Sequence, residues 1–378
     1  MQLLLDGFGG DARKGPPQGK SEIACYHVNC RVSDGMDDIG SVRFGKFLAL
    51  VGYCLEAIWC RFRYGISTLY YVPAPGKRSA LYRDWVVMLL CRPFFKHLIL
   101  HWHAVGLGEW LECYGTRAER WITQRLLGRP DLSIALACAS SNDAAWLLSR
   151  KTVIVPNGLP DPCPEFSTEI LPLKKSRIEQ RKRRREPESG EISPSYRALF
   201  LGHCIREKGL FDSLEGVALF NQRHPDFPIH LTVAGLFMDE AEKHEFTERI
   251  ARPDLSGFVT YAGFVSGAAK NDLLRESDCL CFPTYYRAES FGLTIVEAMA
   301  FGIPSIVTRW RAIPEILPQD YSGYVAQQSP TEIADALEQM AGADLAETLR
   351  AHYLEHFSAQ SWMRQLAASI KMPKLAAV

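Results

Sequence analysis

Residues 281–304 read CFPTYYRAESFGLTIVEAMAFGIP, and this stretch decides how the second half of the chain folds. Its apolar beginning indicates the end of a buried strand, which Pro283 terminates. Gly292 gives the backbone the freedom to turn, and the apolar residues after it recur at helical spacing. The stretch therefore predicts a strand, a turn and a helix that begins near Gly292.

Two carboxylates flank this predicted turn. Glu289 lies just before the helix, and Glu297 lies one to two turns inside it. The first turn of a helix offers unbonded N–H groups and a positive dipole end, which suit a phosphate. Carboxylates beside a phosphate can accept hydrogen bonds from hydroxyl groups, so a nucleotide sugar fits both halves of the site. Taken alone, the two residues could equally be a solvated loop glutamate and a surface helix glutamate.

Further strand-like stretches surround the paired glutamates in a fixed order. They are residues 199–210 (LFLGHCIREKGL), 231–235 (LTVAG), 259–264 (VTYAGF) and 277–283 (SDCLCFP). As an ordered set they resemble the C-terminal domain of glycosyltransferase family 4, the retaining GT-B enzymes of glycosyl transferases group 1. The resemblance covers residues 195–320 well and residues 95–160 more weakly. It implies an α/β protein of the GT-B fold, with two Rossmann-like, doubly wound domains facing a central cleft.

The N-terminal half alternates predicted strands and helices, as in parallel sheets covered on both faces. The predicted strands are Leu3–Leu5, Ala24–Val28, Thr68–Val72, Leu98–Trp102, Ile134–Ala139 and Thr152–Val155, and the predicted helices are Val42–Arg61, Ala80–Leu90 and Glu109–Leu127. We expect an acceptor-side domain in residues 1–165, a charged linker in 166–195, a donor domain in 196–357 and a terminal helix in 358–378. The resemblance implies that this last helix crosses back onto the first domain.

The linker is strongly basic, because residues 174–185 read KKSRIEQRKRRR. This composition predicts a flexible or only marginally helical segment. A solvated linker is the favoured interpretation, contact with an anionic membrane is the next, and nucleic-acid binding is a further one. The stretch Trp59–Tyr64 could join such a membrane surface, or it could be core with snorkelling arginines.

Gly9 and Gly10 follow the first predicted strand. A glycine turn at that place can approach a phosphate closely, which makes both residues candidates for nucleotide-sugar binding. About 18 residues separate the first two apolar runs, too few for a full crossover helix. Either this first unit is reduced or the chain begins late.

The resemblance assigns roles to the residues around the predicted turn. It implies that Glu289 lies near the donor sugar and that Glu297 binds the ribose hydroxyls. The backbone amides of Phe291, Gly292 and Leu293 would hold the diphosphate.

Lys208 matches the Lys-Gly turn of the family and follows a strand that ends at Gly202. A lysine is a point charge suited to a departing diphosphate, although a solvated surface lysine is the alternative. The family often has an arginine directly after the glycine that corresponds to Gly202, and here that residue is His203. Arg206 is the alternative source of this charge.

His101 and His103 lie at the end of the Leu98–Trp102 strand, on the same face because strand residues alternate. Ligands of open α/β sheets bind beyond the carboxyl ends of the strands. The family often has a histidine here that faces the donor sugar. We prefer His103 for this role because it is nearer the loop, and a structural histidine is the alternative for both.

Composition narrows the classes of partner. The 43 Lys and Arg balance the 43 Asp and Glu, so charge gives no reason to expect nucleic-acid binding. The eleven cysteines form no C-x-x-C pair, which favours buried thiols in a reducing compartment over disulfides or a zinc site. No Asp-x-Asp motif occurs, so we expect no metal and no other cofactor. With no signal peptide and no run of ~20 apolar residues, we expect a cytoplasmic protein, with peripheral contact to the membrane as an extension.

The resemblance implies transfer of a hexose-type sugar from a nucleoside diphosphate to an acceptor hydroxyl, with retention at the anomeric carbon. It implies a role in polysaccharide, lipopolysaccharide or glycolipid synthesis, with a sugar or lipid-linked acceptor. Three alternatives remain. They are another GT-B enzyme such as an epimerase or a phosphorylase, a non-catalytic nucleotide-sugar-binding protein, and an interaction protein that acts through its basic linker.

Overall fold

A computed structural model of the chain describes residues 2–14, 23–30, 44–184 and 196–371. The chain divides into two compact units. The first unit comprises residues 1–156 and 362–378, and the second comprises residues 157–361. No helix of the described ranges is long and apolar enough to span a bilayer.

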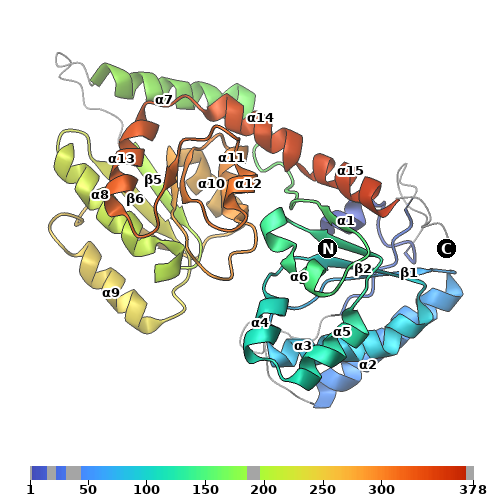
Figure 1. Cartoon of the computed structure of the whole chain (residues 1–378). Helices are drawn as coiled ribbons and strands as arrows, with labels where there is room; N and C mark the ends of the chain where they lie inside the picture. The colour runs from blue at the N-terminus through green and yellow to red at the C-terminus, as the bar shows by residue number, and fades with distance from the viewer. Residues whose placement is uncertain (1, 15–22, 31–43, 185–195, 372–378) are drawn as a thin grey trace. The chain divides into compact units, whose positions relative to one another are not determined.

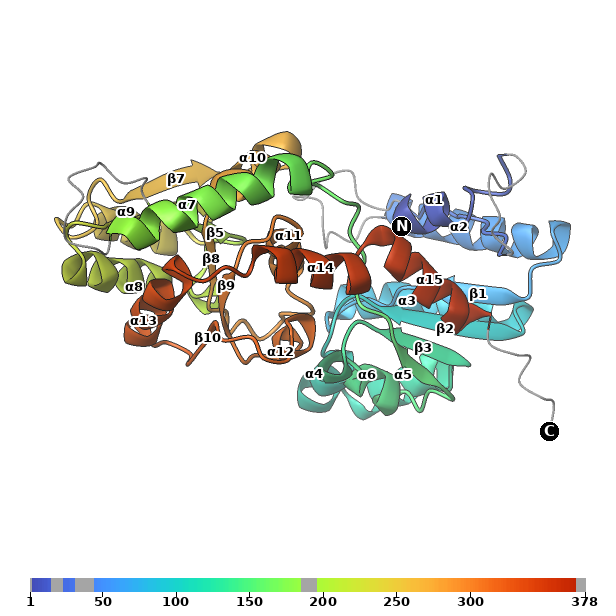
Figure 2. The ribbon, with the colours of Figure 1, turned by 90° about the horizontal axis from the view of Figure 1, so that it is seen from above.

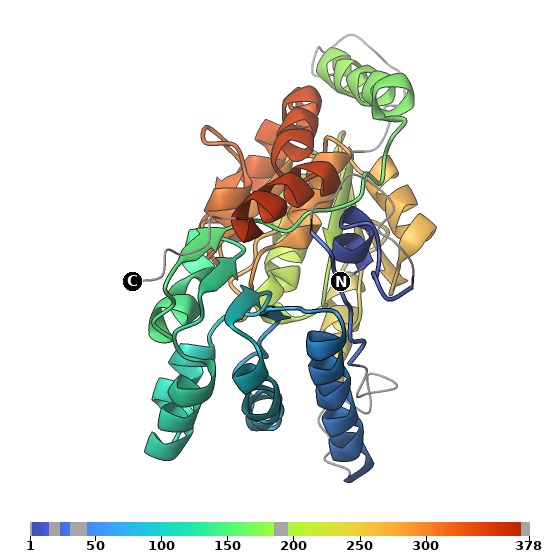
Figure 3. The same cartoon turned by 90° about the vertical axis from the view of Figure 1, so that its right-hand side faces the viewer.

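The first unit contains a parallel sheet of four described strands. In the order β1-β2-β3-β4, they are Thr68–Tyr71, His97–Trp102, Leu132–Ala135 and Thr152–Ile154. Helices α2 (Phe44–Arg63), α3 (Arg78–Cys91) and α5 (Arg117–Leu127) cover one face, as Figure 3 shows, with α4 (Leu107–Tyr114) and α6 (Asn142–Trp146) nearby. Side chains of β2 alternate between faces, so Leu98, Leu100 and Trp102 pack into this helical layer.

The opposite face of this sheet packs against the two ends of the chain. Helix α1 (Gln2–Gly7) and helix α15 (Ala359–Ile370) share a core with the sheet, formed by Leu4, Phe8, Ile99, Leu132, Ile134, Val155, Trp362 and Leu366. The predicted strand Leu3–Leu5 is therefore wrong, because these residues are helical, and Leu4 and the first residue after the helix, Phe8, reach the same core one turn apart. The predicted strand Ala24–Val28 is also wrong, since Cys25 makes only an isolated bridge to Asp11.

The predicted long helix Glu109–Leu127 is two helices, α4 and α5. Gly115 ends the first, and Thr116 caps the second. The Thr116 hydroxyl accepts from the Glu119 amide, and the Glu119 carboxylate accepts from the Thr116 amide. This capping box provides side-chain acceptors for two backbone amides, which in a continuous helix would donate to backbone carbonyls. The predicted helix Val42–Arg61 begins outside the described residues, and its described part lies within α2.

The second unit contains a six-stranded parallel sheet. Its strands are β5 (Tyr196–Leu201), β6 (Ile229–Ala234), β7 (Val259–Gly263), β8 (Cys279–Phe282), β9 (Ser305–Thr308) and β10 (Tyr324–Val325). Their spatial order is β10-β9-β8-β5-β6-β7, and Figure 2 shows β5, β8, β9 and β10 in that succession. The chain thus adds β6 and β7 on one side of β5, and then adds β8, β9 and β10 on the other side. The point between β5 and β8 is a topological switch point, where ligands of such sheets bind beyond the carboxyl ends of the strands.

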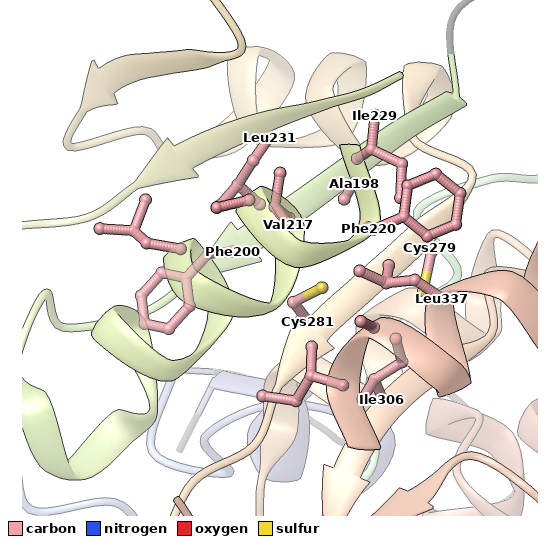
Figure 4. Close-up of a cluster of buried hydrophobic side chains, with 14 of the residues drawn as sticks. Ala198, Phe200, Val217, Phe220, Ile229, Leu231, Cys279, Cys281, Ile306 and Leu337 are labelled. Atoms are coloured by element: carbon pink, nitrogen blue, oxygen red, sulfur yellow. The ribbon is translucent and has the colours of Figure 1, made fainter. Parts of the chain in front are cut away.

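Two helices cover one face of this sheet side by side, α8 (Leu210–Arg223) and α13 (Pro330–Ala341), as Figure 1 shows. Figure 4 shows Val217 and Phe220 of α8 and Leu337 of α13 meeting side chains of four strands. Cys279 and Cys281 belong to this core as buried thiols, and all eleven cysteines are free. The remaining helices are α9 (Glu240–Ile250), α10 (Gly267–Glu276), α11 (Leu293–Ala300), α12 (Ile313–Ile316) and α14 (Ala346–His356).

The basic stretch, expected to be a flexible or only marginally helical linker, is a helix, α7 (Leu171–Arg184), within the second unit. Lys174 is buried and donates to the Ser277 carbonyl at 2.8 Å. Arg181 is also buried, 3.1 Å from an Asp278 carboxylate oxygen, and donates to the Ala341 carbonyl. These partners lie about a hundred or more residues away along the chain, and they turn a segment of low apolar content into a packed one. Residues 185–195 of the expected linker lie outside the described residues.

Candidate functional site

The switch point of the second sheet brings together Lys208 and Glu289. Lys208 lies in a short turn (Arg206–Lys208) after β5, and Glu289 lies in the segment that follows β8. The Lys208 ammonium nitrogen lies 2.5 Å from Glu289 Oε2. Two residues 81 positions apart in the sequence thus form one ion pair beyond the two central strands.

This pair is withdrawn from water. Lys208 and Glu289 are each only 8% exposed. The ammonium also lies 5.1 Å from the ring centroids of both Phe282 and Tyr286, where aromatic faces attract a cation. A buried charge needs such partners because leaving water costs several kcal/mol per ion. Removal of either partner would leave a charge that an incoming anion or cation could complement.

Gly209 lets the two segments approach each other. Its φ is +79°, in the region that favours glycine, and a Cβ there would lie 2.6 Å from the Pro283 carbonyl oxygen. The Tyr285 amide donates to the Glu207 carbonyl at 2.8 Å, which joins the two segments a second time. The Lys-Gly turn expected from the sequence is therefore packed directly against the end of β8.

Helix α11 begins beside this pair. Gly292 precedes the helix with φ +85°, and no side chain caps the helix start within the described chain. Phe291 is buried and Leu293 is exposed. The first turn of α11 thus presents backbone N–H groups and a positive dipole end at the carboxyl end of β8, as the sequence predicted.

Glu297 lies one turn further along α11 and is buried. One of its carboxylate oxygens lies 2.5 Å from the ammonium nitrogen of Lys270, which comes from α10. Lys270 was not identified from the sequence. A lysine on a polar helix gives no local sign of a partner 27 residues away, so only the folded arrangement of α10 and α11 could have revealed the pair.

Arg206 does not join the ion pair of Lys208 and Glu289. Its guanidinium pairs with Glu245 at 2.5 Å and lies 4.5 Å from the centroid of the Phe211 ring. Its backbone amide donates to the Glu242 carboxylate. The residue is engaged with α8 and α9, so the sequence expectation that it supplies charge at the site has no contact to support it.

Gly202 lies at the carboxyl end of β5, as expected. Its amide donates to the Ala234 carbonyl, and its own carbonyl lies 1.7 Å from where a Cβ of Gly235 would stand. Two glycines therefore let the ends of β5 and β6 meet closely at this edge of the sheet.

The first unit places His101 and His103 at the end of β2 on one face, with ring centroids 4.2 Å apart. His101 is buried, and its Nδ1 is hydrogen-bonded to the Tyr70 hydroxyl. Burial, with a smaller contribution from the charge of His103, lowers the pKa of His101 to about 3. His103 is exposed in the loop beyond the strand, and its partial desolvation lowers its pKa. The structural role considered for both residues thus fits His101, whereas His103 remains accessible.

Gly9 and Gly10 end a helix rather than follow a strand. Both have positive φ, and their amides donate to the carbonyls of Asp6 and Leu5. A left-handed glycine is the usual end of a helix. The expected phosphate-binding turn after a first strand is therefore not formed by these two residues.

Metal ligands do not gather anywhere in the described ranges: no group of three His, Cys, Asp or Glu side chains is arranged to hold an ion. The site at the switch point consists of two lysines, two glutamates and the start of α11. Such a set offers positive charge and amide donors to a diphosphate, and carboxylate acceptors to hydroxyl groups.

Residues 181–350 match the family described as Glycosyl transferases group 1. Mannosylfructose-phosphate synthase of Agrobacterium fabrum is 34% identical over 113 residues, which cover 29% of this chain and 24% of that protein. D-inositol 3-phosphate glycosyltransferase of Paenarthrobacter aurescens is 25% identical over 179 residues, or 47% of this chain and 43% of that protein. The matched segments thus span less than half the length of these relatives.

A solved structure extends the likeness to both units at the level of the fold. Anabaena HepE, crystallised with UDP and glucose, superposes with a TM-score of 0.61 at 17% identity, covering 88% of this chain and 84% of that one. The GT-B fold expected from the sequence is confirmed. The region that carries the paired glutamates, Lys208 and the switch point belongs to the glycosyl transferases group 1 family, which confirms the resemblance read from the sequence.

Proposed function

We propose that this protein is a retaining glycosyltransferase that moves a hexose-type sugar from a nucleoside diphosphate to an acceptor hydroxyl. The observation that carries the proposal is the buried pair of Lys208 and Glu289 at the switch point of the second sheet. HepE, which shares the fold, was crystallised in complex with UDP and glucose, and this supports a nucleotide-sugar donor.

Lys208 would stabilise the departing diphosphate. As the bond from the anomeric carbon to the diphosphate lengthens, negative charge grows on the leaving oxygens. A cation held in a desolvated position, together with the amides of Phe291, Gly292 and Leu293, is complementary to that charge. Glu289 holds the ammonium in place until the donor arrives.

The two glutamates would accept hydrogen bonds from the hydroxyl groups of the donor. Glu289, beside Lys208, is proposed to orient the sugar. Glu297, held by Lys270, is proposed to accept hydrogen bonds from the ribose. His103, at the end of β2 in the first unit, is proposed as a further orienting residue for the sugar. No described side chain is assigned as a nucleophile.

The charges named above support a metal-independent reaction, because Lys208 and the start of α11 supply the positive charge that a metal would otherwise provide. A sugar or a lipid-linked sugar is the proposed acceptor, in polysaccharide, lipopolysaccharide or glycolipid synthesis. The names of two relatives mention a sugar phosphate and an inositol phosphate, and those names describe the relatives. The proposed location is cytoplasmic, with peripheral contact to the membrane.

Release of nucleoside diphosphate from UDP-, GDP- and ADP-sugars tests the proposal, with mass spectrometry of the glycosylated acceptor. We expect one donor class to be consumed only when an acceptor is present. NMR of the product should show that the sugar keeps its anomeric configuration. Glu289→Gln and Glu297→Gln should both slow the reaction. Binding without turnover would instead indicate a nucleotide-sugar-binding protein, and turnover that requires inorganic phosphate would indicate a phosphorylase.

A further inference from the structure

Helix α2 exposes a continuous apolar stripe on the side that points away from its own core. Leu50, Cys54 and Cys60 are buried in the first unit. Leu48, Leu55, Trp59 and Phe62 lie on the other side, at spacings of seven, four and three residues, and all four are exposed. The arrangement differs from an ordinary surface helix, whose outer side is polar.

The neighbouring helices continue this apolar surface. Helix α3 lies between α2 and α5 in one layer, as Figure 3 shows. Tyr82 and Leu89 of α3 and Trp121 of α5 are exposed, and they line an open apolar groove of about 530 Å³ between the two helices. We call the exposed apolar residues of the three helices the helix-layer face: Leu48, Leu55, Trp59, Phe62, Tyr82, Leu89 and Trp121. Monomeric soluble proteins rarely expose so many large apolar side chains together without an interaction partner.

The same elements are strongly basic, although the whole chain has balanced charges. Helices α2, α3 and α5 and the short turn η2 (Arg92–Phe94) hold nine Lys and Arg against three Asp and Glu. Each of the three carboxylates is already in an ion pair: Glu56 with Arg13, Asp84 with Arg83, and Glu119 with Arg78. Two of the nine cations, Arg83 and Arg78, are the partners of Asp84 and Glu119, and the four elements together carry an excess of six positive charges.

A basic hollow lies at one end of this layer. Phe62 of α2 packs edge-on against Phe94 of η2, with ring centroids 6.0 Å apart, and the Arg61 guanidinium donates to the Phe94 carbonyl. Beside η2, a cavity of about 120 Å³ is lined by Arg92, Lys96, Arg129 and Arg150, with Asp131 as its acidic residue. Its size and charge suit a phosphate group.

We propose that the helix-layer face docks on an anionic lipid bilayer, with its aromatic and aliphatic side chains at the level of the headgroups and its arginines on lipid phosphates. Apolar side chains gain from leaving water at such an interface, and arginines and tryptophans are suited to its two-sided chemistry. Each basic residue near an anionic surface adds attraction. A protein partner would have to combine an apolar surface with excess negative charge, a combination that an anionic bilayer presents everywhere.

The membrane surface inferred here differs from the one that the sequence suggested. The basic residues of α7 were the first candidates, but Lys174 and Arg181 are buried in contacts with their own unit. Of the stretches that the sequence suggested, only Trp59–Tyr64 contributes to the helix-layer face. Lipid binding is measured without donor or acceptor, so its outcome is independent of the proposed sugar transfer.

Co-sedimentation of the full chain with vesicles of phosphatidylcholine alone, or of phosphatidylcholine with phosphatidylglycerol, tests the inference. We expect binding to the anionic vesicles, weakened by salt, and little binding to the neutral ones. Arg63→Ala and Arg125→Ala should each weaken binding about fivefold, the factor for one basic residue near an anionic surface.

Phe62→Gln is the decisive variant, and Phe264→Gln is its matched control. The two phenylalanines are 67% and 66% exposed, but Phe264 lies in the second unit. Phe62→Gln should weaken vesicle binding about tenfold, as for the loss of one buried aromatic side chain, and the control should bind like wild type. Circular dichroism and thermal unfolding show whether both variants fold.

Two results would overturn the inference. One is equal vesicle binding by Phe62→Gln and Phe264→Gln when both are folded. The other is absence of binding to anionic vesicles together with concentration-dependent dimerisation in sedimentation velocity that Phe62→Gln abolishes. The second result would assign the helix-layer face to another copy of the chain.

Discussion

The two parallel sheets differ in what lies at the carboxyl ends of their strands. In the second unit, β5 and β8 lie on either side of a switch point, and the segments after them bring Lys208 and Glu289 within 2.5 Å. In the first unit, the four described strands lie side by side in the order in which they occur along the chain, and His101, the next-to-last residue of β2, is buried against Tyr70. Where the strand order reverses, the segments that follow the two central strands run in opposite directions across the sheet. This leaves the carboxyl ends of both strands open to a ligand. A strand between neighbours that wind the same way can instead end in packing.

The largest expected effect concerns His101, which tests the packing role of the first unit. Its pKa is about 3 when folded and near 6.5 when unfolded, so the unfolded chain binds more protons between these values. The free energy of unfolding should therefore fall as pH drops from 6.5 towards 3, by at most about 5 kcal/mol from this residue. Urea unfolding of the first unit, followed across this pH range, should show a flatter dependence in His101→Leu. Identical slopes in wild type and variant would argue that His101 is solvated.

The second effect concerns Lys208, which tests the ligand-binding role of the second unit. Lys208→Met removes the cation proposed to face the leaving diphosphate, so the turnover number should fall by about 100- to 1000-fold. Glu289 would be left buried and unpaired, so the double variant Lys208→Met/Glu289→Gln serves as the folding control. Single-turnover kinetics separate the chemical step from donor binding. An unchanged chemical step in a folded variant would remove Lys208 from the mechanism.

A third effect concerns Lys174, a basic residue that the sequence placed in a linker. Burial lowers its pKa to about 8 in the folded protein, well below the unfolded value. The unfolded chain therefore binds more protons between pH 8 and 10.5, and stability should rise with pH in this window by up to about 3 kcal/mol. Lys174→Met should lose this rise in denaturant titrations at pH 8 and pH 10. A rise of equal size in the variant would assign it to other groups.

The smallest effect concerns Arg206, whose role in donor binding is compared with that of Lys208. Arg206 is half-exposed and paired with Glu245, and an ion pair of this kind contributes up to about 1 kcal/mol. Arg206→Gln should therefore change donor affinity less than tenfold and leave the turnover number nearly unchanged. Isothermal titration with the donor and steady-state kinetics measure both quantities. A loss as large as that of Lys208→Met would show that the guanidinium leaves Glu245 when the donor binds.

Much of the second unit could be predicted from the sequence, because its signals are local. An apolar run followed by glycine or proline marks the ends of β5 and β8, and Glu289 and Glu297 stand at fixed distances from Gly292. The partner of Glu297 could not be predicted in this way. Lys270 lies on another helix, and nothing in its own surroundings in the sequence marks it as paired.

The errors share a physical cause, which is packing against distant segments. Three consecutive leucines close to Met1 are too few to show a period, and in the folded chain they lie in a helix whose Leu4 shares a core with α15 and the sheet. The basic stretch of α7 is ordered by Asp278 and by backbone carbonyls far along the chain. Local composition indicated a flexible or only marginally helical segment because it contains no information on these partners.

Donor binding to wild type and Lys208→Met tests the central claim most directly. Titration calorimetry with the nucleoside diphosphate that the wild type binds would be compared with Arg197→Met, a control at the start of β5 whose cation is in an exposed ion pair. We predict that Lys208→Met weakens binding at least tenfold, since hydrogen bonds to charged groups contribute about 1.5–3 kcal/mol, and that Arg197→Met binds like wild type. Equal affinities in all three proteins would contradict the assignment of the nucleotide to the switch point between β5 and β8.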